Sequence, residues 1–298
     1  MSHGLPPKQG LYDPQFEHDA CGVGFVVDIN GRKSHDIVGQ GIKVLENLAH
    51  RGASGCDPLT GDGAGIMLQM PDKFLRKAAL AQGIDLPPEG DYACGNVFLP
   101  NELQSRNMAE GWVEQMIREE GQRFLGWRNI PFDERHVGQV ARAVQPELRQ
   151  LFVGRGASTR PEDFERKLYV LRKRCWTKVL LSTIHHRSLF YMCSLSSKTI
   201  VYKGQLMAEQ LGPFFKDLAD PDMASALALV HSRYSTNTFP TWSLAHPYRM
   251  VAHNGEINTL RGNLNWMRAR EKQMAYEPFG KDMRKVYPVI GPFGSDSA

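Results

Sequence analysis

The sequence lacks long hydrophobic runs and a strong charge of either sign. No apolar stretch in its 298 residues approaches the roughly 18 to 20 residues that a membrane span needs. The 36 basic and 32 acidic residues leave a net charge of +4, and no basic stripe interleaved with aromatic residues is present. The composition therefore gives no support for a membrane protein or for nucleic-acid binding, and indicates an ordinary globular chain.

Cysteine is also scarce. The five cysteines are odd in number and widely spaced, without a Cys-x-x-Cys pair or a Cys/His ligand grouping: Cys21, Cys56, Cys94, Cys175 and Cys193. This pattern excludes a disulfide framework and a structural zinc site of the usual spacing, and it indicates a reducing compartment. We therefore expect a cytoplasmic protein without a bound metal.

A glycine-rich run, Thr60-Gly61-Asp62-Gly63-Ala64-Gly65-Ile66, invites a nucleotide-binding interpretation that its details disfavour. The dinucleotide fingerprint requires glycine where Ile66 stands and a helix afterwards, whereas a strand is expected here; a phosphate-loop lysine is also missing. Two interpretations remain open. The run is either a tight turn that permits close backbone approach, or a loop that lines a substrate pocket.

Periodicity predicts a mixture of strands and helices without a regular βαβ alternation. Asn30-Gly31 is typical of a hairpin turn after the first strand. The expected strands are residues 22–29, 66–70, 179–184, 189–193, 199–202, 226–230 and 249–253. The expected helices are residues 37–50, 102–120, 162–174, 206–219 and 259–276. This order favours a largely antiparallel, layered α+β domain over a doubly wound sheet.

The first strand begins with a thiol. Residues 1–20 have neither helical nor strand periodicity and are interpreted as a leader, whereas Cys21 opens an apolar strand. If the chain is cut after Ala20, Cys21 gains a free α-amine with a pKa of about 8, which can accept the thiol proton without a histidine. This arrangement would make Cys21 a nucleophile.

Two polar clusters follow expected strands near the end of the chain. Arg233, in His231-Ser232-Arg233-Tyr234-Ser235-Thr236, can bind a carboxylate bidentately, or it can be an ordinary surface arginine. Asn254 and Gly255 offer a side-chain amide and an unshielded backbone N–H, which suit an oxyanion hole. Asn-Gly is equally typical of a hairpin turn, so each cluster alone leaves both interpretations open.

Taken together and in order, six motifs resemble the class II glutamine amidotransferases, which are N-terminal-nucleophile hydrolases. The residues in and beside several motifs are most similar to those of the glutamate synthase large subunits. These residues are Thr236 to Trp242, Asn254 to Thr259 and Glu17 to Ala20. The six motifs are Ala20-Cys21-Gly22-Val23-Gly24, Leu48-Ala49-His50-Arg51-Gly52, Gly61-Asp62-Gly63-Ala64-Gly65-Ile66, His231-Ser232-Arg233-Tyr234-Ser235-Thr236, His253-Asn254-Gly255-Glu256 and Ser295-Asp296-Ser297. The resemblance runs from about Tyr12 to the last residue.

The resemblance implies a four-layer αββα sandwich and a role for each matching residue. Cys21 would attack the glutamine carboxamide, and Asn254 with Gly255 would hold the oxyanion. Substrate-binding roles fall on four residues: Arg233 for the α-carboxylate, Asp296 for the α-ammonium, and Arg51 with Gly52 lining the same pocket. The implied activity is hydrolysis of L-glutamine to L-glutamate and ammonia, with the ammonia serving reductive glutamate synthesis from 2-oxoglutarate in the full-length enzyme.

The resemblance also implies parts that these 298 residues do not contain. Residues 21–298 would form the glutaminase domain, with its C-terminal end truncated, so that the sandwich would be incomplete there. FMN, an iron-sulfur cluster and an electron-donating small subunit or ferredoxin belong to the full-length family, and no cofactor is expected within this chain. Two alternatives stay open: a catalytically silent binding or regulatory fragment that keeps its leader, and another class II amidotransferase.

Overall fold

A computed structural model describes residues 7–16, 22–55, 57–232, 239–249, 259–291 and 294. Within these described ranges, eight strands form two four-stranded sheets in which every pairing is antiparallel. The order is β1-β8-β2-β7 in the first sheet and β4-β5-β3-β6 in the second. Two antiparallel sheets combined with helices confirm the α+β class.

The first sheet contains the strands that adjoin most of the sequence motifs. Its members are β1 (Val23–Val27), β8 (Leu227–Ser232), β2 (Ala64–Gln69) and β7 (Thr199–Gly204). β8 lies between β1 and β2, so Val23 is opposite His231, and His231 is opposite Gly65. β1 is an edge strand, and its Phe25 and Val27 side chains are exposed.

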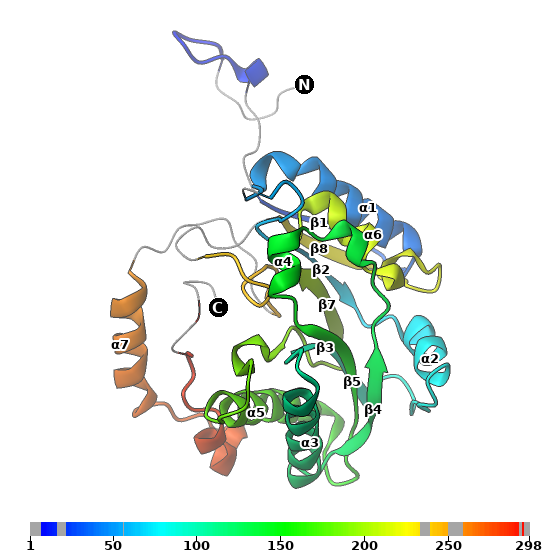
Figure 1. Ribbon diagram of the computed structural model, residues 1–298, viewed down its shortest axis with the longest axis vertical. Helices are drawn as coiled ribbons and strands as arrows, with labels where there is room; N and C mark the ends of the chain where they lie inside the picture. Colours follow the sequence, from blue (N-terminus) through cyan, green and yellow to red (C-terminus); the bar gives the residue numbers. More distant parts are fainter. Residues whose placement is uncertain are drawn as a thin grey trace.

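The helix α1 (His35–Asn47) covers one face of the first sheet (Figure 1). Ser34 begins it as an N-cap, since its hydroxyl accepts a hydrogen bond from the Ile37 N–H at 3.4 Å. Apolar residues recur on one side of the helix, and Ile37, Val38 and Leu45 are buried. The Cβ of Ala228 lies 2.6 Å from where a Cβ on Gly41 would stand, so the helix approaches β8 closely.

The second sheet comprises β3 (Tyr92–Leu99), β5 (Glu147–Gly154), β4 (Arg123–Asn129) and the short β6 (Tyr191–Met192). Two long helices, α3 (Leu103–Glu119) and α5 (Pro161–Leu180), pack against one of its faces (Figure 1). Glu102 caps α3 through the N–H groups of Gln104 and Ser105, and Pro161 stands at the first turn of α5. The remaining short helices are α2 (Asp72–Leu80), α4 (Gln139–Ala143) and α6 (Leu211–Phe214).

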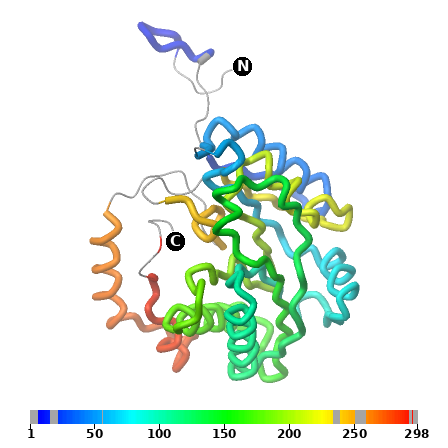
Figure 2. The backbone as a smooth tube through the Cα atoms, viewed as in Figure 1, coloured from blue at the N-terminus to red at the C-terminus, as the bar shows by residue number. Residues whose placement is uncertain are grey.

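The last helix, α7 (Leu260–Glu271), is followed by a segment that returns along α5 (Figure 2). The 3-10 helical segment Glu277–Lys285 contacts α5 through an ion pair between Lys167 and Asp282 at 2.5 Å. The Tyr169 and Phe279 rings meet edge to face, with centroids 6.0 Å apart. Within the described residues, no helix combines the length and the apolar character needed to cross a membrane.

Several elements differ in secondary structure or pairing from the sequence-based expectation. Asn30-Gly31 forms a turn, but the chain then enters α1, and β1 pairs with β8 rather than with a following strand. Residues 179–180 end α5, and residues 182–184 are in no strand, so the expected strand 179–184 does not form. Residues 206–219 are divided among three short helical turns, Ala208–Gln210, Leu211–Phe214 and Lys216–Ala219, and the extended backbone of Phe215 separates the last two. The expected strand 249–253 lies almost wholly outside the described residues.

Candidate functional site

The start of β1, the end of β8 and the turn after α1 meet at one place. The Ser232 N–H donates to the Gly22 carbonyl oxygen at 2.8 Å. A Cβ placed on Gly52 would lie 3.4 Å from Ser232 Oγ, so Gly52 lies beside the same strand end. We define Gly22, Arg51, Gly52 and Ser232 as the candidate site.

The turn that carries Arg51 and Gly52 follows directly from the end of α1. Residues Ala49–Arg51 form a 3-10 helix, with the Arg51 N–H donating to Leu48 O at 2.8 Å and the Gly52 N–H to Ala49 O at 3.0 Å. Within the described part of the chain, Arg51 Nε and Ser232 Oγ are buried and have no hydrogen-bond partner. Buried polar atoms are normally paired, so the unpaired Ser232 Oγ at the end of β8 suits a site that binds a polar ligand.

Five predicted site residues lie outside the described residues: Cys21, Arg233, Asn254, Gly255 and Asp296. In the sequence, Cys21 directly precedes Gly22, and Arg233 directly follows Ser232. Their roles therefore stay predictions, whereas the structure brings Gly52 to the strand end that adjoins two of them.

The glycine-rich run is a tight turn with close backbone approach. The segment closes on itself, with a β-bridge between Ser54 and Gly61, and the Asp62 N–H donates to Ala53 O at 3.2 Å. A Cβ on Gly61 would lie only 2.2 Å from the backbone of Leu206, so a side chain has no room at this position. The close backbone approach of the first interpretation is confirmed at Gly61, and the pocket-lining interpretation stays a prediction.

Asp57 holds this turn in place. Its carboxylate accepts hydrogen bonds from the Thr60 hydroxyl at 2.8 Å, from the Leu59 N–H at 3.1 Å and from the Val140 N–H at 3.2 Å. The Thr60 hydroxyl and then the Leu59 N–H lower the pKa of Asp57, because they stabilise the carboxylate. The turn is therefore tied to α4 as well as to itself.

Further side chains pack together on the face of the first sheet that carries His231. The register places His231, Gly65 and Lys203 in one row across β8, β2 and β7. The His231 and His246 rings are 4.2 Å apart between centroids, and a Cβ on Gly65 would lie 2.3 Å from the His246 carbonyl oxygen. The segment around His246 therefore lies directly over Gly65, between the two neighbouring side chains.

Sequence reasoning missed Lys203, which is buried among these side chains. A signal was present, since Thr199-Ile200-Val201-Tyr202-Lys203-Gly204 places one charge in an otherwise buried strand. A lysine is seldom fully buried unless it is paired or hydrogen-bonded, so its presence in a core strand indicates a specific set of acceptors.

We predict that Gly65→Ala lowers the free energy of unfolding by about 1–3 kcal/mol, because the added methyl group overlaps His246 O and Lys203 Cβ. Urea unfolding followed by circular dichroism measures the change. The matched control is Gly39→Ala in α1, where a Cβ meets nothing within 4 Å. The control should be neutral or more stable by about 0.5–1 kcal/mol, since alanine favours a helix. Equal stability of wild type and Gly65→Ala would contradict the close approach.

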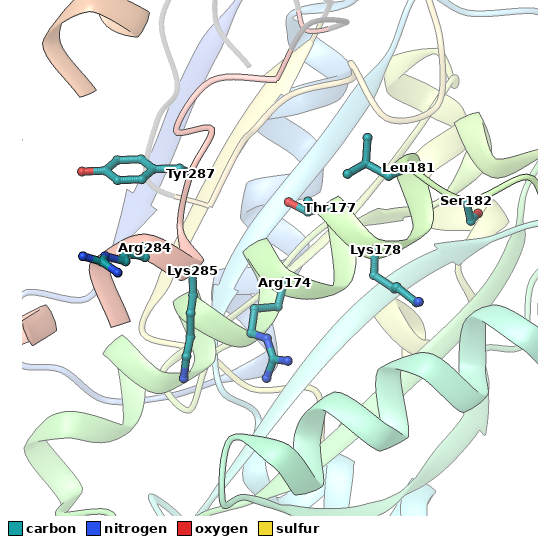
Figure 3. A pocket seen from close by; sticks show the side chains of 8 residues that line it. All are labelled: Arg174, Thr177, Lys178, Leu181, Ser182, Arg284, Lys285 and Tyr287. Carbon is teal, nitrogen blue, oxygen red and sulfur yellow. The ribbon is translucent and has the colours of Figure 1, made fainter. Parts of the chain in front are cut away.

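A surface pocket of about 430 Å³ lies elsewhere, between α5 and the 3-10 segment that follows α7 (Figure 3). Eight residues line it: Arg174, Thr177, Lys178, Leu181, Ser182, Arg284, Lys285 and Tyr287. None of them is a predicted site residue. Two of its four cations already have carboxylate partners: Arg174 and Lys285 pair with the buried Glu120 at 2.6 and 2.9 Å, and also with Glu119 and Asp282, respectively.

The described residues contain no group of three or more His, Cys, Asp or Glu side chains placed to hold a metal ion. The cysteines Cys94, Cys175 and Cys193 are free and buried. Cys94 lies in β3, Cys175 in α5 and Cys193 directly after β6. The described residues therefore offer no ligand set for an iron-sulfur cluster.

The sheet order, the site at the end of β8 and the sequence motifs agree with one family. The family model of the class II glutamine amidotransferases matches residues 21–298. The chain belongs to the class II glutamine amidotransferases.

Its relatives include longer proteins. The chain is 49% identical over 295 residues to the glutamate synthase (NADPH) large chain of Bacillus subtilis (strain 168), covering 99% of this chain and 19% of the relative. It is 45% identical over 287 residues to the glutamate synthase (NADPH) large chain of Azospirillum brasilense, covering 96% and 19%. It is 38% identical over 282 residues to ferredoxin-dependent glutamate synthase 2 of Synechocystis sp. (strain ATCC 27184 / PCC 6803 / Kazusa), covering 94% and 18%. The chain thus spans about a fifth of the length of these relatives.

Proposed function

We propose that this chain hydrolyses L-glutamine to L-glutamate and ammonia through a thioester on Cys21. Removal of residues 1–20 would give Cys21 a free α-amine, which takes the thiol proton as the sulfur attacks the side-chain amide carbon. Arg233 would bind the substrate α-carboxylate and Asp296 its α-ammonium, because a free amino acid presents both charges. Arg51 and Gly52 would line the same pocket.

The reaction then needs stabilisation of a developing negative charge. The carbonyl oxygen of the tetrahedral intermediate would accept hydrogen bonds from the Asn254 amide and the Gly255 N–H. The C–N bond breaks as the α-ammonium of Cys21 returns its proton to the leaving nitrogen, which departs as ammonia. Water, deprotonated by the same amine, attacks the thioester and releases glutamate with the free thiol.

One observation carries the proposal: three sequence-distant segments converge at the end of β8. Gly22 is hydrogen-bonded to Ser232, and Gly52 lies beside the Ser232 hydroxyl. The unpaired Ser232 Oγ adds a polar atom at that place. The family match begins at residue 21, which supports a mature chain that starts with Cys21.

In a longer protein like the relatives named above, the ammonia would serve reductive synthesis of glutamate from 2-oxoglutarate. FMN, an iron-sulfur cluster and the electron donor would then be held by other domains or by a partner subunit or ferredoxin. We place the reaction in the cytoplasm, where a reducing environment would keep the Cys21 thiol unoxidised.

The direct test is glutamate release by the purified chain, with its N-terminal residue identified by intact-mass analysis. We expect the mass of a chain that begins at Cys21 and steady turnover of glutamine to glutamate and ammonia in equal amounts. A folded chain that begins at Cys21 and releases no glutamate would overturn the proposal. A chain that keeps residues 1–20 and gains no activity after their removal would instead favour a silent binding fragment.

A further inference from the structure

Lys203 is a buried ammonium in the first sheet. Its side chain is almost wholly inaccessible, at 1% exposure. Its Nζ donates to the Ser243 carbonyl oxygen at 2.8 Å and to the Ala245 carbonyl oxygen at 2.7 Å. Among the residues that the structure describes, no carboxylate forms an ion pair with it. Burial lowers the pKa of Lys203, whereas the two carbonyl acceptors favour its protonated, donating form.

Two aromatic rings complete the surroundings of this ammonium. Nζ lies 4.4 Å from the centroid of the Tyr248 ring and 4.6 Å from that of Tyr191. Cation–π contacts of this length favour a cation and hold it in a defined position. Three of the four groups around Nζ, namely Ser243, Ala245 and Tyr248, belong to one short segment. Lys203 therefore binds a backbone segment rather than a counter-charge.

That segment, residues 242–249, is named the strap here, and it is fixed at both ends. At its start, the buried Trp242 donates from Nε1 to Ala141 O at 2.9 Å. At its end, the Arg249 guanidinium donates to the Tyr191 hydroxyl and to Met192 O, both at 2.9 Å. Lys203 holds the middle, where the missing side chain of Gly65 admits the His246 carbonyl.

In the sequence, the strap is followed closely by the residues predicted to form the oxyanion hole. Asn254 follows Arg249 by five residues, a stretch that spans at most about 17 Å when fully extended. Donors in an oxyanion hole act only when they are held close to the developing charge, and a displacement of about 1 Å can reduce turnover about 100-fold. Because the stretch is short, the position of Arg249 at the end of the strap restricts where the Asn254 amide and the Gly255 N–H can lie.

We propose that Lys203 is a positioning residue for glutamine hydrolysis: it fixes the strap, and through it the segment that carries Asn254 and Gly255. This inference rests on the proposed function, since it assigns no new substrate. Lys203 acts through the carbonyl groups of Ser243 and Ala245 and does not touch the reacting atoms.

The test compares Lys203→Met with Lys203→Arg and with the control Lys198→Met. Methionine keeps an unbranched side chain but removes the N–H donors of Lys203, whereas arginine keeps N–H donors. Lys198 serves as the control because it is exposed, just before β7. We expect Lys203→Met to lower kcat about 10- to 100-fold with KM changed less than about threefold. Alkylation of Cys21 by iodoacetamide, which needs no oxyanion hole, should keep its wild-type rate. Lys203→Arg should recover most of kcat, and Lys198→Met should match wild type.

Amide hydrogen exchange supplies a second readout, independent of turnover. Peptides covering residues 243–258 should exchange at least about tenfold faster in Lys203→Met than in Lys198→Met, because the strap has lost its central attachment. If Lys203→Met does not fold, Tyr191→Phe removes the hydroxyl acceptor of Arg249 while keeping the ring, and kcat should fall several-fold.

The outcomes separate the two claims. An active wild type with an equally active, folded Lys203→Met variant overturns the positioning role alone, as does unchanged exchange across residues 243–258. An unfolded Lys203→Met combined with a fully active Tyr191→Phe also overturns it. A wild-type chain that begins at Cys21 and releases no glutamate overturns the proposed function, and the positioning role with it.

Discussion

Replacing Asp217 with asparagine should lower the free energy of unfolding by about 3–5 kcal/mol, because it leaves a buried guanidinium without its counter-charge. Both Asp217 oxygens accept from Arg128, each at 2.8 Å, and the two side chains are 2% and 5% exposed. The Tyr202 hydroxyl donates to the same carboxylate at 2.9 Å, and Gln150 Oε1 accepts from Arg128 at 3.1 Å. The network joins β4, β5 and β7, so its loss should weaken the contact between the two sheets.

Urea unfolding monitored by circular dichroism measures the change. The matched control is Asp133→Asn, since Asp133 pairs with Arg135 at 2.6 Å but the arginine is 85% exposed. The control should change stability far less, because water screens an exposed pair. The double variant Arg128→Met with Asp217→Asn should recover part of the lost stability, since no charge then stays buried. Equal effects of Asp217→Asn and Asp133→Asn would show that burial of the Arg128 pair does not determine its contribution.

The largest expected effect on activity comes from Cys21→Ala. Glutamate release should fall at least about 1000-fold, because the proposed thioester cannot form without the sulfur. The assay is glutamate formation at saturating glutamine, alongside mass spectrometry of the enzyme after mixing with substrate. Wild type should show a transient acyl adduct on Cys21, and the variant none.

Cys175→Ala is the matched control for this experiment. Burial raises the pKa of the Cys175 and Cys193 thiols to about 12, so both are unreactive near neutral pH. Cys175→Ala should keep the wild-type kcat while losing about 1 kcal/mol of stability through the small cavity in α5. Substantial glutamate release by Cys21→Ala, or its loss in a folded Cys175→Ala variant, would exclude the proposed assignment of the nucleophile.

The first sheet was largely predictable from sequence, whereas the second was not. β1, β2, β7 and β8 are apolar runs bounded by turn residues, which strand patterns detect. The strands β3, β4 and β5 were missed. β3 is buried on both faces and so shows no alternation, and it carries Gly95 and Asn96 at its centre. Asn96 fits because its amide donates to Val201 O at 3.0 Å and its oxygen accepts from Gln150, partners that only the folded chain supplies.

The end of α5 shows why a local pattern can mislead. Residues 179–184 begin with Val-Leu-Leu, which favours a strand when considered alone. Val179 nevertheless continues the buried stripe of Leu168, Leu171 and Cys175 at spacings of three and four residues, so packing against the second sheet extends the helix to Leu180. Burial of a continuous stripe overrides the local strand preference.

The candidate site was predicted through its motifs, and its supporting residues were not. Motif order alone singled out Arg51 and Gly52, and the structure brings Gly52 to the end of β8. Lys203 and Tyr191 lie in none of the motifs, and their shared contact with the strap depends on the register of β7 against β2 and on the position of β6. Sequence spacing carries no information on such contacts.

The position of β1 at the edge of its sheet bears on how the mature N-terminus can arise. Within the described residues, β1 pairs with β8 alone, through Val23–Val27, and the Gly22 carbonyl adds one further bond to Ser232. The backbone hydrogen bonds described for residues 7–16 join residues of that segment to one another, as between Gln9 and Tyr12. A cut after Ala20 therefore breaks none of these described bonds of the sheet. Removal of residues 1–20 would leave these described bonds intact and would give Cys21 the proposed α-amine.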